Sequence, residues 1–517
     1  MAELLSEEVK ADLRPFVGHQ LLNIITSGMY DDPLMVYREY VQNAVDSIDV
    51  AVHEGVLSEA QGTIAIQIDG DNRTICIEDN GAGLPYGLAA KVLLDLGCSP
   101  KDRTGQRGFR GIGRLGGLAY CDLLRFETRS SEDEDIAVVE WDRGRLDALF
   151  EEVKKKRGLI EVVKDITKVH KKKPTLTDRG HFFRVEMHNV RRFHSDKLMS
   201  VKTVRDYLSQ VSPVPYDGTK FSHAEKVEEY FSDVAGYKNY RLTINGKSVV
   251  RPYTDEIQIS SNVDDRIRDV KLFELPGVHK PLARGWYAIM DYRGSLPPSV
   301  AMRGIRVRQG NIEVGNEFFL SPLYLERRFA TWTIGEIQVW DHNIRPNARR
   351  DGFEQTPEYE SFLEQMSALG RFLSHSCRRS SGQRSRTQAL ARRLEEIESA
   401  LANLTFFIDK EHQLNLIATA RERLEGVRPL IDSSNDGQAL TKKYQELQLR
   451  VDSLEGTNCF FHEWVDGRSI RHADKVDIIG RILKSLYQEY GKCRSVEDLM
   501  QRVLKPFSKS AVKKPLR

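Results

Sequence analysis

The spacing of apolar residues predicts one long amphipathic helix near the start of the chain. Between residues 32 and 52 the apolar positions recur every three or four residues and share one face: Tyr37, Val41, Ala44, Ile48 and Val52. Asp32 suits the N-cap and Pro33 suits the first helical position. The opposite face carries three polar residues: Glu39, Asn43 and Asp46. A polar face of this kind is more often solvated than functional, so the helix alone does not decide its role.

Alternating apolar positions predict strands further along the chain. The pattern occurs in these segments: 64–68 with 73–75, 123–128, 136–141, 240–250, 304–312 and 334–339. Asn245-Gly246 has the composition of a two-residue hairpin turn. The chain up to about residue 370 is therefore predicted to combine helices and strands.

The last third of the chain is predicted to be helical, beginning after a Ser/Arg/Gly stretch at 380–386. One apolar seam repeats at four and three residues: Leu390, Leu394, Ile397, Leu401 and Leu404. A second seam has the same spacing: Leu440, Tyr444, Leu447, Val451 and Leu454. Such seams indicate either a helical hairpin or a dimer interface. Each alone is more often packed within one chain.

Composition is typical of a folded, soluble chain of about three domains. Of 517 residues, 40% are hydrophobic and 29% are charged, and the net charge of +2 gives no overall field that attracts nucleic acid or membranes. No apolar run is long enough to span a membrane, and the N-terminus lacks a signal-peptide pattern. The six cysteines are scattered without a Cys-x-x-Cys pair, which predicts reduced thiols and a cytoplasmic location.

Two glycine motifs downstream give the polar helix face a functional interpretation. A strand at 75–79 delivers Asp79 into a turn with Gly81 and Gly83, where a carboxylate can accept a hydrogen bond from an exocyclic amine. A second motif at 108–113 opens an apolar run, so its glycines can present backbone N–H groups to phosphate. Each motif alone is weak. The helix, the strand-turn and the glycine loop in this order predict an ATP site.

These segments resemble the motifs of the GHKL ATPases, which include gyrase B subunits, MutL, histidine kinases and the ninety-kilodalton heat-shock chaperones. Residues 38–47 resemble the N-box, 79–83 the G1 box and 108–113 the G2 box. The N-box is most similar to that of the heat-shock chaperones, whereas the Gly-Phe-Arg-Gly of the G2 box is closer to MutL. The resemblance covers roughly the first 190 residues.

The resemblance implies ATP and Mg²⁺ as ligands and assigns roles by position. Glu39 corresponds to the carboxylate that polarises the attacking water, Asn43 to the Mg²⁺ ligand and Asp79 to the adenine contact. The other expected nucleotide contacts are Asp46, Gly81, Gly83, Lys101, Gly108, Arg110, Gly111, Ile112 and Gly113. The sequence departs from the family after Gly180, where His181 stands in place of the usual threonine.

A loop in the second part of the chain resembles the middle-domain loop Pro-x-Asn-x-x-Arg-Glu of the heat-shock chaperones. Aligned on Asn347, the arginine that reaches the γ-phosphate in the family corresponds to Arg350, and Asp351 follows it. An ordinary basic surface loop explains these residues equally well. Under the first interpretation, Arg350 joins the site when the two domains close. The lysine clusters at 154–157 and 171–173 could contact a phosphate backbone, but interleaved acidic residues and the lack of accompanying aromatics favour solvated loops.

The predicted fold is α+β with four regions. They are a GHKL (Bergerat) ATPase sandwich at 1–195, a middle or transducer-like α/β domain at 196–376, a helical coiled-coil region at 377–456 and a C-terminal helical region at 457–517.

Several functions fit these motifs. The first is an ATP-hydrolysing conformational clamp, a homodimer that acts on protein clients, and the N-box form and the Arg350 loop favour it. The second is a MutL- or topoisomerase-like clamp on nucleic acid, which the G2 box favours and the near-neutral charge disfavours. The third is an ATP-gated scaffold subunit of a multi-protein system. A histidine kinase is disfavoured because no phospho-acceptor helix precedes the ATP site.

Overall fold

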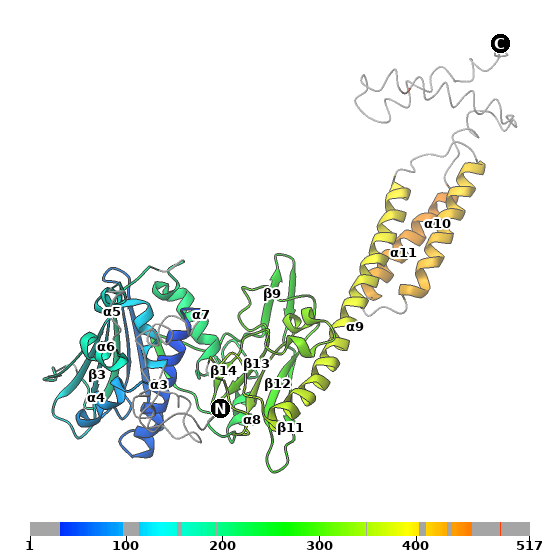
Figure 1. The fold of residues 1–517 in the computed structure, drawn as a ribbon. Helices are drawn as coiled ribbons and strands as arrows, with labels where there is room; N and C mark the ends of the chain where they lie inside the picture. The colour runs from blue at the N-terminus through cyan, green and yellow to red at the C-terminus, as the bar shows by residue number, and fades with distance from the viewer. Residues whose placement is uncertain are drawn as a thin grey trace, which may run out of the picture. The chain divides into compact units, whose positions relative to one another are not determined.

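The computed structural model describes residues 32–96, 113–151, 158–176, 178–192, 195–347, 349–402, 410–431 and 437–456, together with Leu486. The chain divides into two compact units, Met1–Ser380 and Ser381–Arg517. In the described parts, the first unit holds the β-sheets and the second is helical (Figure 1). Among the described helices, none is both long enough and apolar enough to cross a membrane.

An eight-stranded sheet forms the N-terminal part of the first unit, in the order β5-β4-β3-β6-β2-β1-β7-β8. Its strands are β1 Thr63–Asp69, β2 Thr74–Asp79, β3 Cys121–Arg129, β4 Ile136–Asp142, β5 Thr167–Lys172, β6 Phe182–Val190, β7 Arg241–Ile244 and β8 Lys247–Ser248. The hairpin predicted at 64–75 and the strands predicted at 123–128 and 136–141 are confirmed by this sheet. Neighbouring strands are antiparallel except for β1 and β7, which are parallel.

Short helices accompany this sheet. They are α3 Met35–His53, η1 Glu59–Gln61, α4 Tyr86–Leu94, η2 Gly113–Ala119, α5 Arg143–Glu151, α6 Leu159–Ile166, η3 Lys197–Met199 and α7 Val201–Val211. The helix predicted from residue 33 begins two residues later. Asp32 still accepts a hydrogen bond from the backbone N–H of Leu34 at 3.1 Å, but it caps the turn that precedes α3. Pro33 and Leu34 occupy that turn rather than the helix.

Lys171 and Lys172 lie in the edge strand β5, so the prediction of a loop is wrong for them, whereas all three lysine side chains are at least 41% exposed, as a solvated cluster requires. Lys172 is within 3.0 Å of the Glu127 carboxylate, and Lys173 is within 2.6 Å of Asp135. Arg184 also contacts Glu127 at 2.8 Å. These pairs neutralise the cluster, and long-range strand pairing is what brings the acids to it. Residues 154–157 lie outside the described residues.

The hairpin at 240–250 has the predicted turn, but it belongs to the first sheet rather than to the second domain. Strand β7 pairs with β1, matching Thr63 with Arg241 and Ile66 with Ile244. Helix α7 and this hairpin both contribute to the core that contains α3. The first core therefore continues past residue 195. Parallel pairing between strands about 180 residues apart leaves no local signal in the sequence.

A second sheet follows in the order β11-β12-β15-β13-β14. Its strands are β11 Asp269–Leu275, β12 Ala283–Ile289, β13 Gly304–Gln309, β14 Ile312–Val314 and β15 Ile334–Val339, and the separate pair is β9 Glu256–Ser260 with β10 Val263–Arg266. The helices of this part are α8 Ala224–Phe231, η4 Ser321–Leu323, η5 Arg327–Trp332 and the first turns of α9 Pro357–Ala402. The β13–β14 hairpin and the strand at 334–339 are confirmed as predicted.

A cluster of charged side chains is buried between this sheet and the end of α7. The Glu336 side chain is inaccessible to solvent and pairs with Arg251 and Arg308. Arg308 also donates hydrogen bonds to the backbone carbonyls of Gln210 and Ser212, where α7 ends. These carbonyls are the negative end of the α7 dipole, so they help to compensate the buried guanidiniums. The cluster fixes the end of α7 to the second sheet.

The C-terminal unit packs α10 Lys410–Ile431, α11 Gly437–Ser453 and η6 Leu454–Gly456 with the second half of α9. Four residues of the first predicted seam and four of the second are buried in its core: Leu390, Leu394, Ile397, Leu401, Leu440, Leu447, Val451 and Leu454. The remaining core residues include Ile417, Leu424 and Val427 of α10. The seams thus pack within one chain, and this core does not provide a two-stranded dimer seam. The stretch at 380–386 does not interrupt α9.

Candidate functional site

Helix α3 is covered on its polar face as well as on its apolar face. Tyr37, Val41 and Ala44 are at most 3% exposed in the core of the first sheet. On the other face, Asp46 is 3% exposed, and the Glu39 side chain is 14% exposed. A solvated polar face is therefore excluded. Buried carboxylates require hydrogen bonds, cations or a ligand beside them, so this face is a candidate site.

The turn after β2 packs directly on α3. The backbone N–H of Gly81 donates to a carboxylate oxygen of Asp79 at 2.9 Å, and the N–H of Ala82 donates to the Ser47 carbonyl at 3.1 Å. A Cβ atom at residue 81 would lie 2.2 Å from the Ser47 hydroxyl, which explains the glycine. This close approach brings Asp79, itself 3% exposed, to the polar face of α3.

The same turn is held from the side of β3 and β6. Gly83 has a φ of +68°, and a Cβ atom there would lie 2.1 Å from the carbonyl oxygen of Arg129. His181 donates from Nδ1 to the Gly81 carbonyl at 2.8 Å, because a carbonyl oxygen can only accept. The residue that departs from the family pattern therefore supports the turn that carries Asp79.

Only the last residue of the expected G2 box lies in the described part of the chain. Gly113 begins η2, whereas the predicted contacts Lys101, Gly108, Arg110, Gly111 and Ile112 lie outside the described residues. The Tyr40 hydroxyl of α3 accepts from the Gly117 N–H and donates to the Arg114 carbonyl, both at 3.0 Å. A Cβ atom at residue 117 would lie 2.4 Å from this hydroxyl. Tyr40 thus fixes the segment that follows the glycine loop on α3.

Arg38 joins the two sheet-containing parts of the first unit. Its guanidinium is 3.7 Å from the Glu39 carboxylate and donates a 2.9 Å hydrogen bond to the carbonyl oxygen of Arg349. The Arg38 side chain is 4% exposed. The sequence prediction did not include Arg38 among the site residues. The available signal was an arginine directly before the candidate catalytic acid on a helix with buried neighbours.

The loop that contains Arg350 has a defined backbone. Asn347 donates to the Gly352 carbonyl at 2.9 Å, and the Arg350 N–H donates to the Asn347 carbonyl at 3.1 Å. Arg350 has a φ of +53° and is 7% exposed. The backbone N–H of Gly315 donates to the Arg350 carbonyl at 2.8 Å. Arg350 is therefore buried in a loop whose neighbours Arg349 and Asp351 are exposed, and the Arg349 carbonyl contacts α3 through Arg38.

Tyr207 of α7 lies among the same charged groups. Burial raises the pKa of its hydroxyl well above the usual value, while the nearby Arg38 guanidinium opposes that rise. Glu313 of β14 and Glu39 of α3 act on the hydroxyl in the same direction as burial. Tyr207 is partly buried and packs against the core that contains α3. It was not predicted from the sequence, because its position depends on the packing of α7.

The donor set fits a magnesium nucleotide. Asn43 follows Glu39 by one helical turn and is partly exposed, and its amide oxygen is the type of hard ligand that Mg²⁺ takes. No group of three or more His, Cys, Asp or Glu residues arranged for a metal is found in the described parts of the chain. One protein oxygen suffices when phosphate oxygens and water complete the coordination. A bound Mg²⁺ would neutralise phosphate charge.

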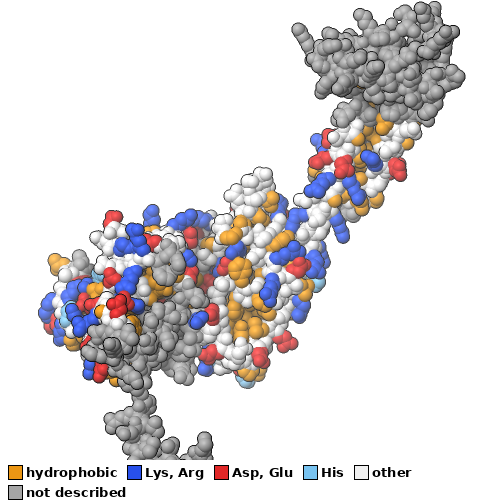
Figure 2. Space-filling view, turned by 45° about the horizontal axis from the view of Figure 1, so that its top comes forward, with side chains coloured by type: hydrophobic (Ala, Val, Ile, Leu, Met, Phe, Trp, Pro, Cys, Tyr) orange, Lys and Arg blue, Asp and Glu red, His pale blue; other side chains and the backbone are white. Residues whose placement is uncertain are grey.

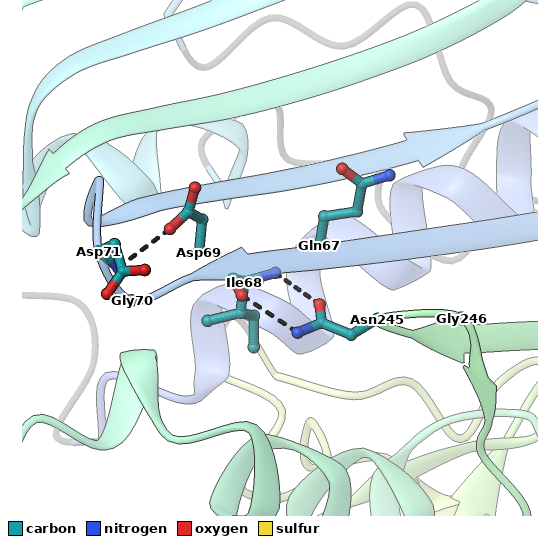
Figure 3. A pocket seen from close by; sticks show the side chains of 7 residues that line it. All are labelled: Gln67, Ile68, Asp69, Gly70, Asp71, Asn245 and Gly246. Carbon is teal, nitrogen blue, oxygen red and sulfur yellow. Dashed lines mark hydrogen bonds between the residues drawn. The ribbon is translucent and has the colours of Figure 1, made fainter.

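A shallow groove of about 550 Å³ lies at the far end of β1, as Figure 3 shows. Its lining consists of Gln67, Ile68, Asp69, Gly70, Asp71, Asn245 and Gly246. The Asn245 amide accepts from the Ile68 N–H at 2.8 Å and donates to the Ile68 carbonyl at 3.1 Å, which secures the β7–β8 turn. Asp69 pairs with Thr74 and Ile64 with Asp79, so the groove and the candidate site lie at opposite ends of β1.

Comparison with known proteins identifies similarities in the region of this site. Residues 35–172 match the family model described as "Histidine kinase-, DNA gyrase B-, and HSP90-like ATPase". The "Chaperone protein HtpG" of Psychrobacter arcticus is 31% identical over 140 residues, which cover 24% of this chain and 21% of the relative. The "Chaperone protein HtpG" of Acinetobacter baylyi is 35% identical over 128 residues, which cover 21% of this chain and 20% of the relative. The protein of the same name from Idiomarina loihiensis is 26% identical over 166 residues, which cover 28% of this chain and 26% of the relative.

The aligned regions span about a fifth to a quarter of the length of these relatives. The matched family segment contains α3, the Asp79 turn and η2. The second sheet and the helical unit lie outside it.

Proposed function

The chain carries an ATPase domain of the GHKL type, similar to that of HtpG, and from this premise we propose that it binds and hydrolyses ATP. The support within the chain is the burial of Asp79 beside a glycine turn and the position of the half-buried Glu39 on the facing helix. Asp79 accepts the exocyclic amine of adenine, and Asn43 is the Mg²⁺ ligand. Asp46 and the glycines of the turn complete the described part of the pocket.

Glu39 is the residue that orients the attacking water. Transfer of a phosphoryl group to water needs an in-line nucleophile and neutralised charge rather than covalent help from the protein. A carboxylate at the edge of a dry pocket can accept the proton of that water. The Arg38 guanidinium, 3.7 Å away, helps to orient this carboxylate.

The single observation that carries the wider proposal is the link through Arg38. One guanidinium contacts the Glu39 side chain and the Arg349 carbonyl, so a movement of the second-domain loop changes the environment of the catalytic acid. We propose that this loop also supplies Arg350 to the γ-phosphate. Hydrolysis would then depend on the position of the second domain, as a conformational clamp requires.

The proposed role is a cytoplasmic clamp that works as a homodimer on protein clients or partner subunits. The similarity to proteins described as chaperones supports a protein client, and the Arg38 link supports a coupling between nucleotide and shape. A dimer interface formed by the buried residues of the two apolar seams is disfavoured, because they pack within one chain. A dimer would therefore use another surface.

Steady-state phosphate release by the full-length protein tests the proposal. We expect ATP-dependent turnover that requires Mg²⁺ and falls at least about tenfold in Glu39→Ala, with nucleotide binding retained. Light scattering with and without a non-hydrolysable ATP analogue tests the dimer. Absence of ATP binding by the wild type contradicts the ATPase assignment. If light scattering shows only monomers at micromolar protein concentration, both with and without the analogue, the dimeric clamp is contradicted. That result leaves the ATPase assignment intact.

A further inference from the structure

One stretch of α9 concentrates positive charge. Between residues 378 and 393 the helix carries six arginines and no aspartate or glutamate: Arg378, Arg379, Arg384, Arg386, Arg392 and Arg393. The whole chain has a net charge of only +2, so the remainder is acidic on balance. The near-neutral total therefore conceals a strongly basic segment. Figure 2 shows blue side chains along this part of the chain.

Most of this stretch is not covered by either hydrophobic core. Cys377 is the last α9 residue in the core of the second sheet, and Leu390 is the first in the core of the helical unit. All residues from 378 to 389 are exposed or half-buried. A helix whose surface is polar all round is in contact with solvent or with a partner.

Three of the arginines recur at a heptad spacing in the sequence of α9. Arg379, Arg386 and Arg393 are seven residues apart and all are exposed. Two turns of an α-helix take 7.2 residues, so each step drifts by only about 20° around the axis and advances by about 10.5 Å. Within the second unit, Arg386 and Arg393 therefore lie on one face of α9, about 10.5 Å apart along its axis. Arg379, at the end of the first unit, continues the same spacing in the sequence, and the three residues are called the basic strip.

Intramolecular ion pairs do not account for this strip. Within the described parts of the chain, no carboxylate lies within 4.0 Å of Arg379, Arg386 or Arg393. Elsewhere on the same helices, Lys443 pairs with Glu398 at 2.9 Å and Arg421 with Asp452 at 2.9 Å. A helix selected only for solvation and stability would carry charges of both signs, as those neighbours do. Gly382 is exposed within α9, and a glycine inside a helix lowers the stability of that helix. A helix that served only to connect two units would gain from a residue with higher helix propensity there.

We propose that this face of α9 binds the phosphodiester backbone of a nucleic-acid duplex. Guanidiniums bind phosphate oxygens through two parallel hydrogen bonds, and the exposed Gln383, Ser385 and Gln388 are side-chain types that also donate to phosphate. A protein partner would need apolar or aromatic anchors. Between Cys377 and Leu390 the chain offers only Ala389, so recognition by charge and hydrogen bonds is favoured. The site lies outside the ATPase domain and does not depend on ATP hydrolysis.

Fluorescence anisotropy with the full-length protein tests this surface. The probes are fluorescein-labelled DNA and RNA duplexes of 24 base pairs, titrated from 50 to 200 mM salt. We expect binding that weakens steeply with salt. The triple variant Arg379→Gln, Arg386→Gln and Arg393→Gln should bind at least tenfold more weakly. Its log-log salt slope should fall by about one for each arginine removed. The DNA and RNA arms assign the duplex type.

A matched control removes three exposed positive charges from the neighbouring helices. The triple variant Arg423→Gln, Arg428→Gln and Lys442→Gln should bind within about twofold of the wild type, because these residues lie outside the strip. Circular dichroism at 222 nm shows whether each variant keeps its helix content. If the triple glutamine variant loses helix content, the triple Arg→Lys variant is used in its place. Lysine retains the charge, so this variant should weaken binding by a smaller factor.

Three results would overturn the proposal. The first is absence of binding to either duplex at 50 mM salt. The second is an equal loss of affinity in the α9 and control variants, which would show unspecific attraction. The third is displacement of the duplex by poly-glutamate at equal charge concentration, which would identify an acidic protein segment as the partner.

Discussion

The guanidinium of Arg38 donates a 2.9 Å hydrogen bond to the backbone carbonyl oxygen of Arg349, which lies 311 positions further along the chain. The same guanidinium is 3.7 Å from the carboxylate of Glu39. A side chain that is 4% exposed and shared between two partners cannot change one contact without affecting the other. This arrangement links the candidate catalytic acid to the loop that contains Arg349.

Replacement of Asp79 by asparagine should abolish specific nucleotide binding. The amide oxygen can still accept from the Gly81 N–H, so the turn keeps its geometry while the charged acceptor for the adenine amine is lost. A hydrogen bond to a charged group is worth about 1.5–3 kcal/mol, so we expect ATP affinity to fall at least tenfold in calorimetry. Asp69→Asn, at the opposite end of β1, should bind as the wild type does. Unchanged affinity in Asp79→Asn would refute the adenine assignment.

Replacement of Glu39 by alanine should separate binding from hydrolysis. The variant should bind ATP with nearly normal affinity but release phosphate at least about tenfold more slowly, because the water loses its proton acceptor. Glu54→Ala, at the exposed end of the same helix, is the matched control and should retain full turnover. Normal turnover of purified Glu39→Ala would remove Glu39 from the catalytic role.

Replacement of Arg350 by alanine should affect turnover rather than affinity. If its guanidinium contacts the γ-phosphate mainly in the closed state, hydrolysis slows about tenfold, or about 1.4 kcal/mol, at unchanged ATP affinity. Arg349→Ala should stay within about twofold, since Arg349 contributes its backbone carbonyl to Arg38. If Arg349→Ala carries the whole defect instead, the alignment on Asn347 is displaced by one residue. If neither variant differs from the wild type, this loop does not contribute to hydrolysis, despite its similarity to the loop of the chaperones.

Replacement of Glu336 by glutamine should destabilise the second sheet strongly. Burial by itself raises the pKa of Glu336, but the Arg251 and Arg308 guanidiniums and two tyrosine hydroxyls lower it below the usual value. Loss of the carboxylate leaves buried guanidiniums without their partner, which costs about 3–5 kcal/mol of unfolding free energy in denaturant titrations. Glu274→Gln removes a carboxylate that is 43% exposed and paired with Arg284, and it should cost less than about 1 kcal/mol.

The same carboxylate predicts an acid dependence with a defined sign. A pKa that is lower in the folded state contributes stability above the unfolded value, and this contribution is lost as the pH falls through the folded value. The wild type should therefore lose stability as the pH drops below about 4.5, the ordinary glutamate pKa. Glu336→Gln should show a flatter acid dependence. Identical acid curves for the two proteins would show that Glu336 does not control this transition.

Replacement of Leu394 by alanine should unfold the helical unit selectively. Leu394 is fully buried among α9, α10 and α11, and truncation of a buried leucine costs about 2–5 kcal/mol. Leu449→Ala changes the same residue type where it is 71% exposed and should be nearly neutral. Thermal melting followed at 222 nm should show a lower first transition only for Leu394→Ala. A change in oligomeric state without loss of helix content in Leu394→Ala would instead support an intermolecular seam.

Local patterns in the sequence were sufficient to predict two elements of the candidate site, helix α3 and the turn after Asp79. The period of the apolar positions identified α3, and the glycines around Asp79 identified a turn whose close packing excludes a Cβ atom at residue 81. These features depend on neighbours within a few residues, so they remain visible without the fold. The similarity of the N-box and glycine boxes to GHKL ATPases was confirmed by the family match over 35–172.

Contacts between distant segments were decided only by the tertiary structure. The parallel pairing of β1 with β7, the bond from Arg38 to Arg349 and the burial of both apolar seams in one core each join segments far apart in sequence. A heptad pattern is the same whether its partner is a second chain or another helix of the same chain. Sequence alone therefore determined which faces must be covered, and the long-range packing determined what covers them.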